Sequence, residues 1–125
     1  MTCTPDFNEP LLVFGGVYSN AQALDALFAF SRARGIPPER WICTGDVIAY
    51  CADARACLER VRDSGAVFIA GNCEENLGAQ AQDCGCGFTP GSSCDALSAS
   101  WYAHASMQMD ADLRSYLAAL PLRLD

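Results

Sequence analysis

Polar side chains that can bind a metal ion or carry a proton follow two short apolar segments of the chain. They are Asp46 after the first segment, and Asn72, Cys73 and Glu74 after the second. Carboxylate and amide oxygens are ligands for hard divalent cations, and a thiolate suits a softer metal such as zinc. A glycine precedes each set, so a ligand could approach the backbone closely. The pattern indicates a metal site, although Asp46 could instead cap a turn and Glu74 could begin a helix.

Apolar segments alternate with amphipathic ones in the first part of the chain. The predicted strands are residues 11–16, 41–44 and 66–71, and the predicted helices between them run from the caps Asn20 and Asp53 to Gly35 and Gly65. This alternation predicts an α/β fold, a parallel sheet with flanking helices on both faces. Because such sheets bind ligands at the carboxyl ends of their strands, we expect Asp46 and Asn72 to lie side by side, next to the "GGVYSN" turn.

The second part of the chain predicts helices around a loop rich in glycine and cysteine. The predicted elements are a helix at 74–82, the loop at 83–95, a helix at 96–107, a helix from the cap Asp110 to Pro121, and a strand beginning at 122–125. A length of 125 residues suits a single domain, residues 1–125.

The charge of the chain excludes two kinds of partner. A net charge of −7 argues against non-specific binding to nucleic acid, which needs basic residues to neutralise phosphates. It also argues against docking on anionic lipid. The apolar runs are too short to span a membrane, and the N-terminus has no leader-like segment. We expect a cytoplasmic protein with no nucleic-acid or membrane partner.

Eight cysteines in a chain without a leader favour reduced thiols over a disulfide scaffold. Cys43 and Cys57 lie in apolar surroundings and are expected to fill the core.

A second candidate site is the cysteine-rich loop. Cys84, Cys86 and Cys94 give the spacing C-x-C-x7-C, with Cys73 as a possible fourth thiolate. Structural zinc sites use C-x2–4-C pairs, and C-x-C is tighter than that. A zinc site is therefore one alternative, beside a metal-free reduced loop, an iron–sulfur cluster and a redox disulfide.

The order of the segments "VFGGVYSN", "ICTGDVIAY" and "VFIAGNCEEN" resembles the N-terminal half of the calcineurin-like metallophosphoesterases. In that family the motifs D-x-H, G-D-x-x and G-N-H-[DE] each end a parallel strand. The resemblance runs from about Leu11 to Leu77 and, more loosely, includes "YLAALP" near the end. It implies half of an αββα sandwich and a site with two divalent metals, Mn, Fe or Zn, at which a phosphoester or nucleotide is hydrolysed.

The resemblance implies a role for each residue at the strand ends. Asp46 matches the aspartate that bridges the metals, and Asn72 matches a ligand of the second metal. Cys73 stands where the catalytic histidine would be, and Glu74 matches the acidic residue that supports it. Gly16 and Tyr18 stand at the aspartate and histidine of D-x-H, as degenerate ligands.

These replacements depart from the chemistry of the family. Glycine supplies no ligand, and the pKa of tyrosine, near 10, makes it a demanding one. A thiolate at Cys73 would bind a softer metal but has no proton to give. The sequence has one histidine, His104, which we expect at the surface. We therefore expect a chain truncated at its C-terminal half, with a missing second half or a second copy of the chain covering the sheet.

Three hypotheses follow. The chain is a metal-dependent phosphoester hydrolase, a phosphatase or phosphodiesterase. Alternatively, it is a non-catalytic descendant that binds a phosphate ligand or a protein. In the third hypothesis it is a cysteine-ligated metal-binding or redox protein on the same scaffold.

Overall fold

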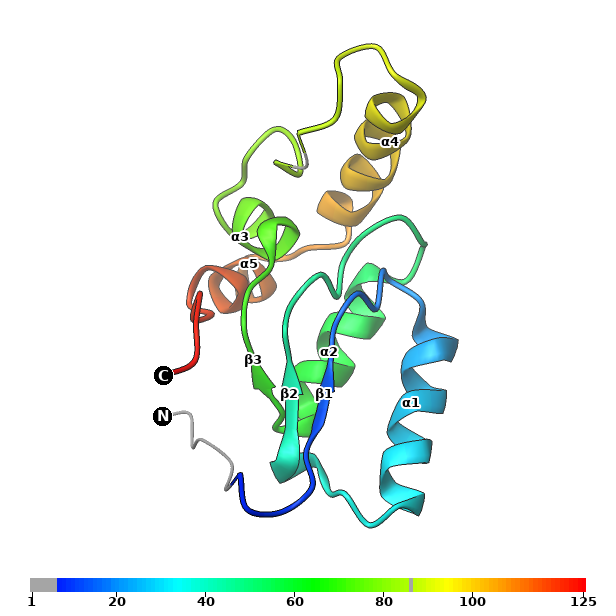
Figure 1. Ribbon diagram of the computed structural model, residues 1–125. Coiled ribbons are helices and arrows are strands. Elements are labelled where there is room, and N and C mark those ends of the chain that lie inside the picture. The colour runs from blue at the N-terminus through cyan, green and yellow to red at the C-terminus, as the bar shows by residue number, and fades with distance from the viewer. Residues whose placement is uncertain (1–6, 86) are drawn as a thin grey trace.

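The computed structural model describes residues 7–85 and 87–125. In that part of the chain, three parallel strands form one sheet in the order β1-β2-β3 (Figure 1). The strands are β1 (Leu12–Phe14), β2 (Trp41–Cys43) and β3 (Val67–Phe68). The predicted α/β fold with a parallel sheet is confirmed, although each strand is shorter than the apolar run that predicted it.

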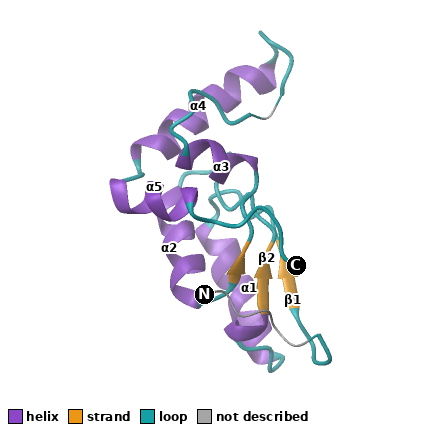
Figure 2. Cartoon of the chain, turned by 90° about the vertical axis from the view of Figure 1, so that its left-hand side faces the viewer, coloured by secondary structure: helices purple, strands orange, loops and turns teal. Residues whose placement is uncertain are grey.

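Five α-helices are present in the described residues, and a short 3-10 helix precedes β2. Their bounds are α1 (Ala21–Ala33), α2 (Ala54–Ser64), α3 (Asn72–Gly78), α4 (Ser93–Met107), α5 (Ala111–Ala118) and the 3-10 helix Pro38–Arg40. Helices α1 and α2 connect successive strands and lie on the same side of the sheet, whereas α3, α4 and α5 lie beyond its carboxyl end (Figures 1 and 2).

The prediction of helices on both faces of the sheet is wrong for the described residues. Both crossover helices lie on one face of the sheet (Figure 2). On the other face the β1 side chain of Val13 is 58% exposed, whereas its register neighbours Ile42 and Val67 are buried. The strands are apolar on both sides, yet only one side is covered by these helices.

The core forms between the sheet and the first two helices. Leu24, Phe28 and Ser31 form a stripe on one side of α1 that faces it. The Phe28 ring stacks on Trp41 of β2 at 4.2 Å. The polar member of the stripe, Ser31, is fully buried, where its hydroxyl accepts a hydrogen bond from Trp41 Nε1 at 2.7 Å and donates one to the Ile36 carbonyl. Cys43 and Cys57 are buried in the same core, as predicted.

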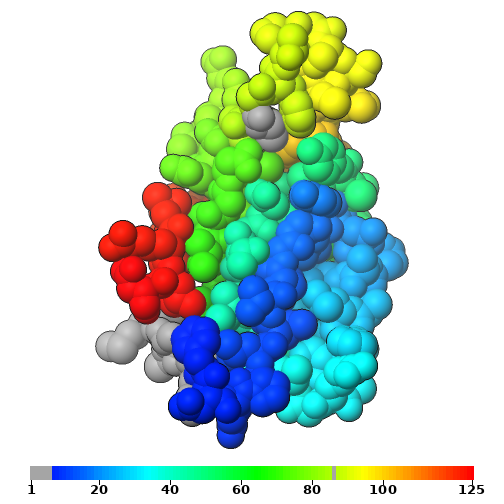
Figure 3. Space-filling model, in the orientation of Figure 1, coloured from blue at the N-terminus to red at the C-terminus, as the bar shows by residue number. Residues whose placement is uncertain are grey.

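Three boundaries in the second part of the chain differ from the prediction. Helix α3 begins at Asn72 rather than at residue 74. Helix α4 begins at Ser93, inside the predicted loop, because the Ser92 hydroxyl accepts from the amide of Asp95. Residues 122–125 form no strand, although Pro121 accepts a hydrogen bond from the Ala70 amide at 2.9 Å. The C-terminal segment therefore lies beside the end of β3, as Figure 3 shows.

In the described residues, every helix is too short or too polar to cross a lipid bilayer.

Ser31→Ala should lower the free energy of unfolding by about 1 kcal/mol, the net contribution of a typical buried hydrogen bond. The indole of Trp41 keeps one acceptor, the Ile36 carbonyl at 3.1 Å, so the loss should not be larger. Urea unfolding measures the effect, and Ser115→Ala at an exposed position of α5 is the control. Equal stabilities for the two variants would contradict the assignment of Ser31 to the core.

Candidate functional site

The three strand ends meet at one place, here called the strand-end rim (residues 15–18, 45–48 and 70–74). The Gly16 amide donates to the Gly45 carbonyl at 3.1 Å, and the Tyr18 amide donates to the Asp46 carbonyl at 3.2 Å. A side chain added to Gly71 would collide with Asp46 Oδ1. The expectation that the segment carrying Asp46 lies beside the one carrying Asn72 is therefore confirmed.

Two glycines allow this close approach. Gly45 has φ 105°, a conformation that L side chains rarely adopt, and a Cβ at this position would overlap the backbone nitrogen of Gly71. The glycines of the "GD" and "GN" pairs are thus required for steric reasons. Because glycine has no Cβ, the two chain segments can lie closer together than any other residue at these positions would allow.

The buried Glu74 side chain connects the segments after β2 and β3 through hydrogen bonds to their backbone amides. It is fully buried, and Oε1 accepts from the amides of Asp46 at 2.6 Å and Gly71 at 3.0 Å. Oε2 accepts from the amide of Ile48 at 3.4 Å. Burial raises the pKa of this carboxyl to about 7, against these backbone hydrogen bonds, which lower it. Both oxygens are engaged by backbone, so Glu74 acts here as a structural bridge.

Asp46 has one carboxylate oxygen that is not used by the protein. Oδ1 is buried and has no hydrogen-bond partner among the described residues. The backbone of Asp46 is left-handed, with φ 55°, a conformation in which aspartate is more common than most residues. A buried carboxylate oxygen without a protein donor is free to serve as a ligand of a cation.

The two residues that follow Gly71 lie in the first turn of α3. Asn72 is exposed, and its Nδ2 donates to the Cys84 carbonyl at 2.9 Å. Cys73 is buried, and burial raises the pKa of its thiol to about 12, with smaller contributions from Glu74 and Asp46. Burial thus favours the protonated thiol over the thiolate at Cys73.

The first strand end supplies an aromatic ring where the metallophosphoesterase motif has ligands. Gly16 has no side chain, and a Cβ there would lie 3.3 Å from the Tyr18 ring. The Tyr18 ring packs edge-on against Tyr50, with centroids 5.0 Å apart.

The rim does not fit a site for two divalent metals. Within residues 7–85 and 87–125 there is no group of three His, Cys, Asp or Glu side chains that could hold a metal ion. Asp46 offers one oxygen and Asn72 an amide, while the oxygens of Glu74 are engaged by backbone amides. Even one catalytic zinc ion takes three protein ligands, whereas Asp46 and Asn72 are only two.

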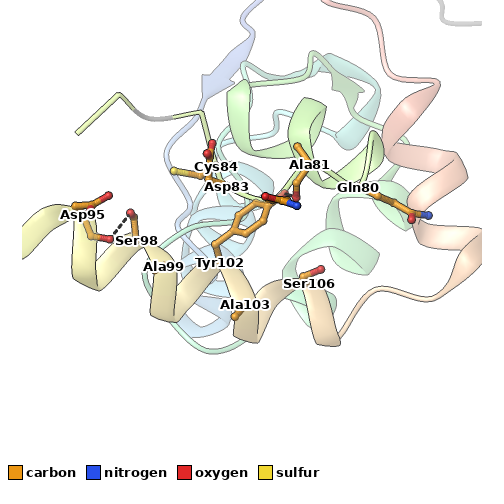
Figure 4. Close-up of a pocket in the computed structure, with 11 residues that line it drawn as sticks. Gln80, Ala81, Asp83, Cys84, Asp95, Ser98, Ala99, Tyr102, Ala103 and Ser106 are labelled. Carbon is orange, nitrogen blue, oxygen red and sulfur yellow. Dashed lines mark hydrogen bonds between the residues drawn. The ribbon is translucent and has the colours of Figure 1, made fainter. Parts of the chain in front are cut away.

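The cysteine-rich loop does not supply the predicted set of thiolates. Cys84 is disulfide-bonded, so it offers no thiolate to zinc, and the expectation of reduced thiols is wrong at this position. Cys86 lies outside the described residues, and Cys94 is an exposed free thiol in the first turn of α4. The hollow beside this loop, about 380 Å³, is lined by polar and apolar side chains of α4 and of residues 80–84, Cys84 included (Figure 4).

A group of aromatic side chains beside the rim was not anticipated from the sequence. Tyr50 packs against Tyr18 on one side and against Trp101 of α4 on the other, at 5.4 Å between ring centroids. The sequence shows one aromatic residue, Tyr50, shortly after the "GD" pair, but its spacing did not predict a contact with α4. His104 is exposed on the same helix, as predicted.

A comparison with solved structures supports the fold. The crystal structure of a metallophosphoesterase from Sphaerobacter thermophilus superposes with a TM-score of 0.64 at 22% identity, over 92% of this chain and 42% of that one. An uncharacterized protein of Methanocaldococcus jannaschii is 31% identical over 74 residues, which are 58% of this chain and 30% of that protein. No family model matches.

The chain therefore has the α/β fold of part of a metallophosphoesterase, and it spans less than half the length of either similar protein.

Gly45→Ala should destabilise the protein by more than about 3 kcal/mol, because the new Cβ would meet the backbone of Gly71 as well as strain φ. Gly35→Ala is the matched control. Its φ is also positive, at 75°, but nothing lies within 4 Å of the new Cβ, so the loss should be about 1 kcal/mol. Thermal unfolding compares the two, and similar losses would show that the rim segments do not touch.

The buried carboxyl of Glu74 should give the stability of the protein a pH dependence. Its folded pKa of about 7 lies above the ordinary 4.5, so the folded state binds the proton more tightly. The free energy of unfolding should therefore fall as pH rises between these two values. Urea unfolding across this window should show a smaller fall for Glu74→Gln and an unchanged one for Glu75→Gln, an exposed neighbour. Identical pH profiles for the wild type and Glu74→Gln would contradict the burial of this carboxyl.

Proposed function

We propose that this chain uses a metallophosphoesterase fold to bind a ligand or a protein without hydrolysing phosphoesters. The observation that carries the proposal is the make-up of the rim. The first strand end offers Gly16 and Tyr18, and the third offers a protonated thiol at Cys73 in place of a histidine. A two-metal hydrolase needs cations that both orient the phosphate and activate water, and this rim lacks the ligands to hold them.

Among non-catalytic roles, the charge of the rim favours a ligand other than phosphate. Asp46 and Glu74 are the ionisable carboxyl groups at its centre, and both disfavour an anion when ionised. The guanidinium groups of α2 are held in surface ion pairs, for example Arg60 with Asp25 at 2.8 Å and Arg55 with Asp110 at 3.1 Å. A phosphate at the rim would meet these carboxyl groups, while the guanidinium groups of Arg55 and Arg60 are already paired.

One observation favours the hydrolase as a second candidate. Asp46 Oδ1 is buried without a partner in the described part of the chain, at the position where the resemblance places a metal-bridging aspartate. Since the chain spans 42% of the similar metallophosphoesterase, further ligands would have to come from other polypeptide. In that case Asp46 and Asn72 would hold one cation, manganese, iron or zinc, together with residues from elsewhere.

Hydrolysis of p-nitrophenyl phosphate and bis-p-nitrophenyl phosphate, assayed with Mn²⁺, distinguishes the non-catalytic binding protein from the hydrolase. We expect no turnover above that of Asp46→Asn. Turnover by the wild type that Asp46→Asn abolishes would replace the binding role with the hydrolase.

Restoring the missing ligands tests the position of the rim itself. The double variant Gly16→Asp, Tyr18→His should bind Mn²⁺ at least about tenfold more tightly than the wild type, because it adds two ligands beside Asp46. Aspartate tolerates the left-handed φ of 63° at position 16, and removing the Tyr18 ring clears the contact with the new Cβ. Calorimetry measures the affinity, and the same double variant carrying Asp46→Asn is the control. If the double variant binds Mn²⁺ no more tightly than the wild type, Asp46 does not share a metal site with the first strand end.

A further inference from the structure

Beside the strand-end rim lies a groove of about 600 Å³, between the segment that connects β2 to α2 and the helix α4 (Figure 1). We call it the thiol groove. It is lined by Tyr50, Cys51 and Ala52 of the connecting segment and by Leu97, Ser100, Trp101 and His104 of α4. A volume in this range is typical of sites for small molecules.

The segment that carries Cys51 is fixed to its neighbours by hydrogen bonds. The Cys51 amide donates to the Tyr18 carbonyl at 3.2 Å, and the Ala52 carbonyl accepts from Nε2 of Gln108, the C-cap of α4, at 2.9 Å. Oε1 of Gln108 accepts in turn from the Arg55 amide at 3.0 Å, in the first turn of α2. Cys51 therefore has a defined place in the wall of the groove.

Burial separates the free cysteines of the described residues into two classes. Three are buried, and desolvation raises the pKa of Cys43 and Cys73 to about 12 and that of Cys57 to about 11. Because the thiolate is the nucleophile, these three are unreactive at neutral pH. The exposed free thiols are Cys51 and Cys94. Cys51 lines the groove and Cys94 does not, so a reagent that attacks Cys51 also contacts the groove.

The other polar side chains of the groove can donate hydrogen bonds. Tyr50 and Ser100 carry hydroxyl groups, and none of the described residues that line the groove carries a carboxylate. Nε2 of His104 lies 2.8 Å from the donor Nε2 of Gln108, so the imidazole accepts there and carries its proton on Nδ1. The lining therefore offers donors to the acceptor atoms of a ligand and holds no carboxylate that would repel an attacking thiolate.

Trp101 gives a separate indication of a ligand. Its indole nitrogen is buried without an acceptor among the described residues, whereas buried donors in folded proteins are normally paired. The indole is 6% exposed and packs against Tyr50, which is itself 52% exposed, with ring centroids 5.4 Å apart. A ligand atom that accepts from this N–H would enter beside Tyr50 as that ring turns outward. Leu97, 64% exposed on the same helix, offers apolar contact to the rest of such a ligand.

We propose that Cys51 is a modification site, at which a small aromatic disulfide with an acceptor atom binds in the thiol groove and forms a mixed disulfide. The Cys51 thiol loses its proton to water, and its sulfur attacks one sulfur of the ligand. The disulfide bond of the ligand breaks as the bond to Cys51 forms, and the other half leaves as a thiolate and takes up a proton. Cys51 is oxidised and the released half is reduced. The site goes beyond the proposed binding role and does not depend on it.

The probe is 2,2′-dithiodipyridine, a neutral aromatic disulfide whose ring nitrogens accept hydrogen bonds. The folded full chain is mixed with increasing concentrations of the probe, and peptide mass spectrometry of quenched samples gives the rate of mixed-disulfide formation at each cysteine. The rate at Cys51 should saturate with probe concentration, because binding precedes the reaction. At low probe concentration it should exceed the rate at Cys94 at least about tenfold, since the groove holds the probe beside the sulfur.

Two controls separate the groove from the exposure of the thiol. Bis(2-hydroxyethyl) disulfide has no ring, and with it the ratio of the Cys51 rate to the Cys94 rate should fall at least about fivefold. Ser100→Asp places a carboxylate in the groove and should lower the Cys51 rate with 2,2′-dithiodipyridine at least about fivefold. Ala99→Asp, also at an exposed position of α4 but outside the lining of the groove, should leave that rate unchanged. Thermal unfolding checks that each variant is folded.

Three results would overturn the inference. The first is a rate at Cys51 that rises linearly with 2,2′-dithiodipyridine or does not exceed the rate at Cys94. The second is an equal effect of Ser100→Asp and Ala99→Asp. The third is a preference for Cys51 that persists in the urea-unfolded chain, because it would belong to the local sequence instead of the groove. Phosphoester turnover together with saturable modification of Cys51 would overturn the proposed function alone.

Discussion

The arrangement of the rim depends on one buried carboxylate. Glu74 accepts hydrogen bonds from three backbone amides, two after β2 and one after β3, and so holds the ends of neighbouring strands at fixed positions. A buried acidic group is stable only when its oxygens are satisfied, and these amides satisfy them. The glycines at 45 and 71 make the arrangement possible, since a side chain at either would separate the segments. The positions of Asp46 and of the helix that begins at Asn72 follow from this bridge.

The bridge positions side chains of several kinds at the rim. Asp46 Oδ1 is buried without a donor among the described residues, and its neighbours are a glycine, a tyrosine ring and a buried thiol. Aromatic contacts extend from Tyr18 through Tyr50 to Trp101 of α4. The strand ends thus place aromatic rings beside buried carboxyl groups, and for these ends we propose recognition rather than phosphoryl chemistry.

The sequence predicted the parallel α/β core because apolar runs and amphipathic spacing are local signals, as Leu24 and Phe28 of α1 illustrate. It also predicted that the segments carrying Asp46 and Asn72 lie side by side, since strand ends in a parallel sheet share an edge. It could not predict that Glu74 bonds to amides 26 and 28 residues away, or that Tyr50 contacts Trp101. These contacts depend on how α3 and α4 pack beyond the sheet. The start of α4 was missed because a serine cap inside a polar loop is a weak signal.

We propose that the strand-end rim does not hold two metals. Metal analysis of the purified full chain, after exposure to Mn²⁺, Fe²⁺ and Zn²⁺ and removal of loosely bound ions, measures this. We expect fewer than two metal ions per chain, with any bound ion lost in Asp46→Asn. Two tightly bound ions per chain, both dependent on Asp46 and Asn72, would contradict it.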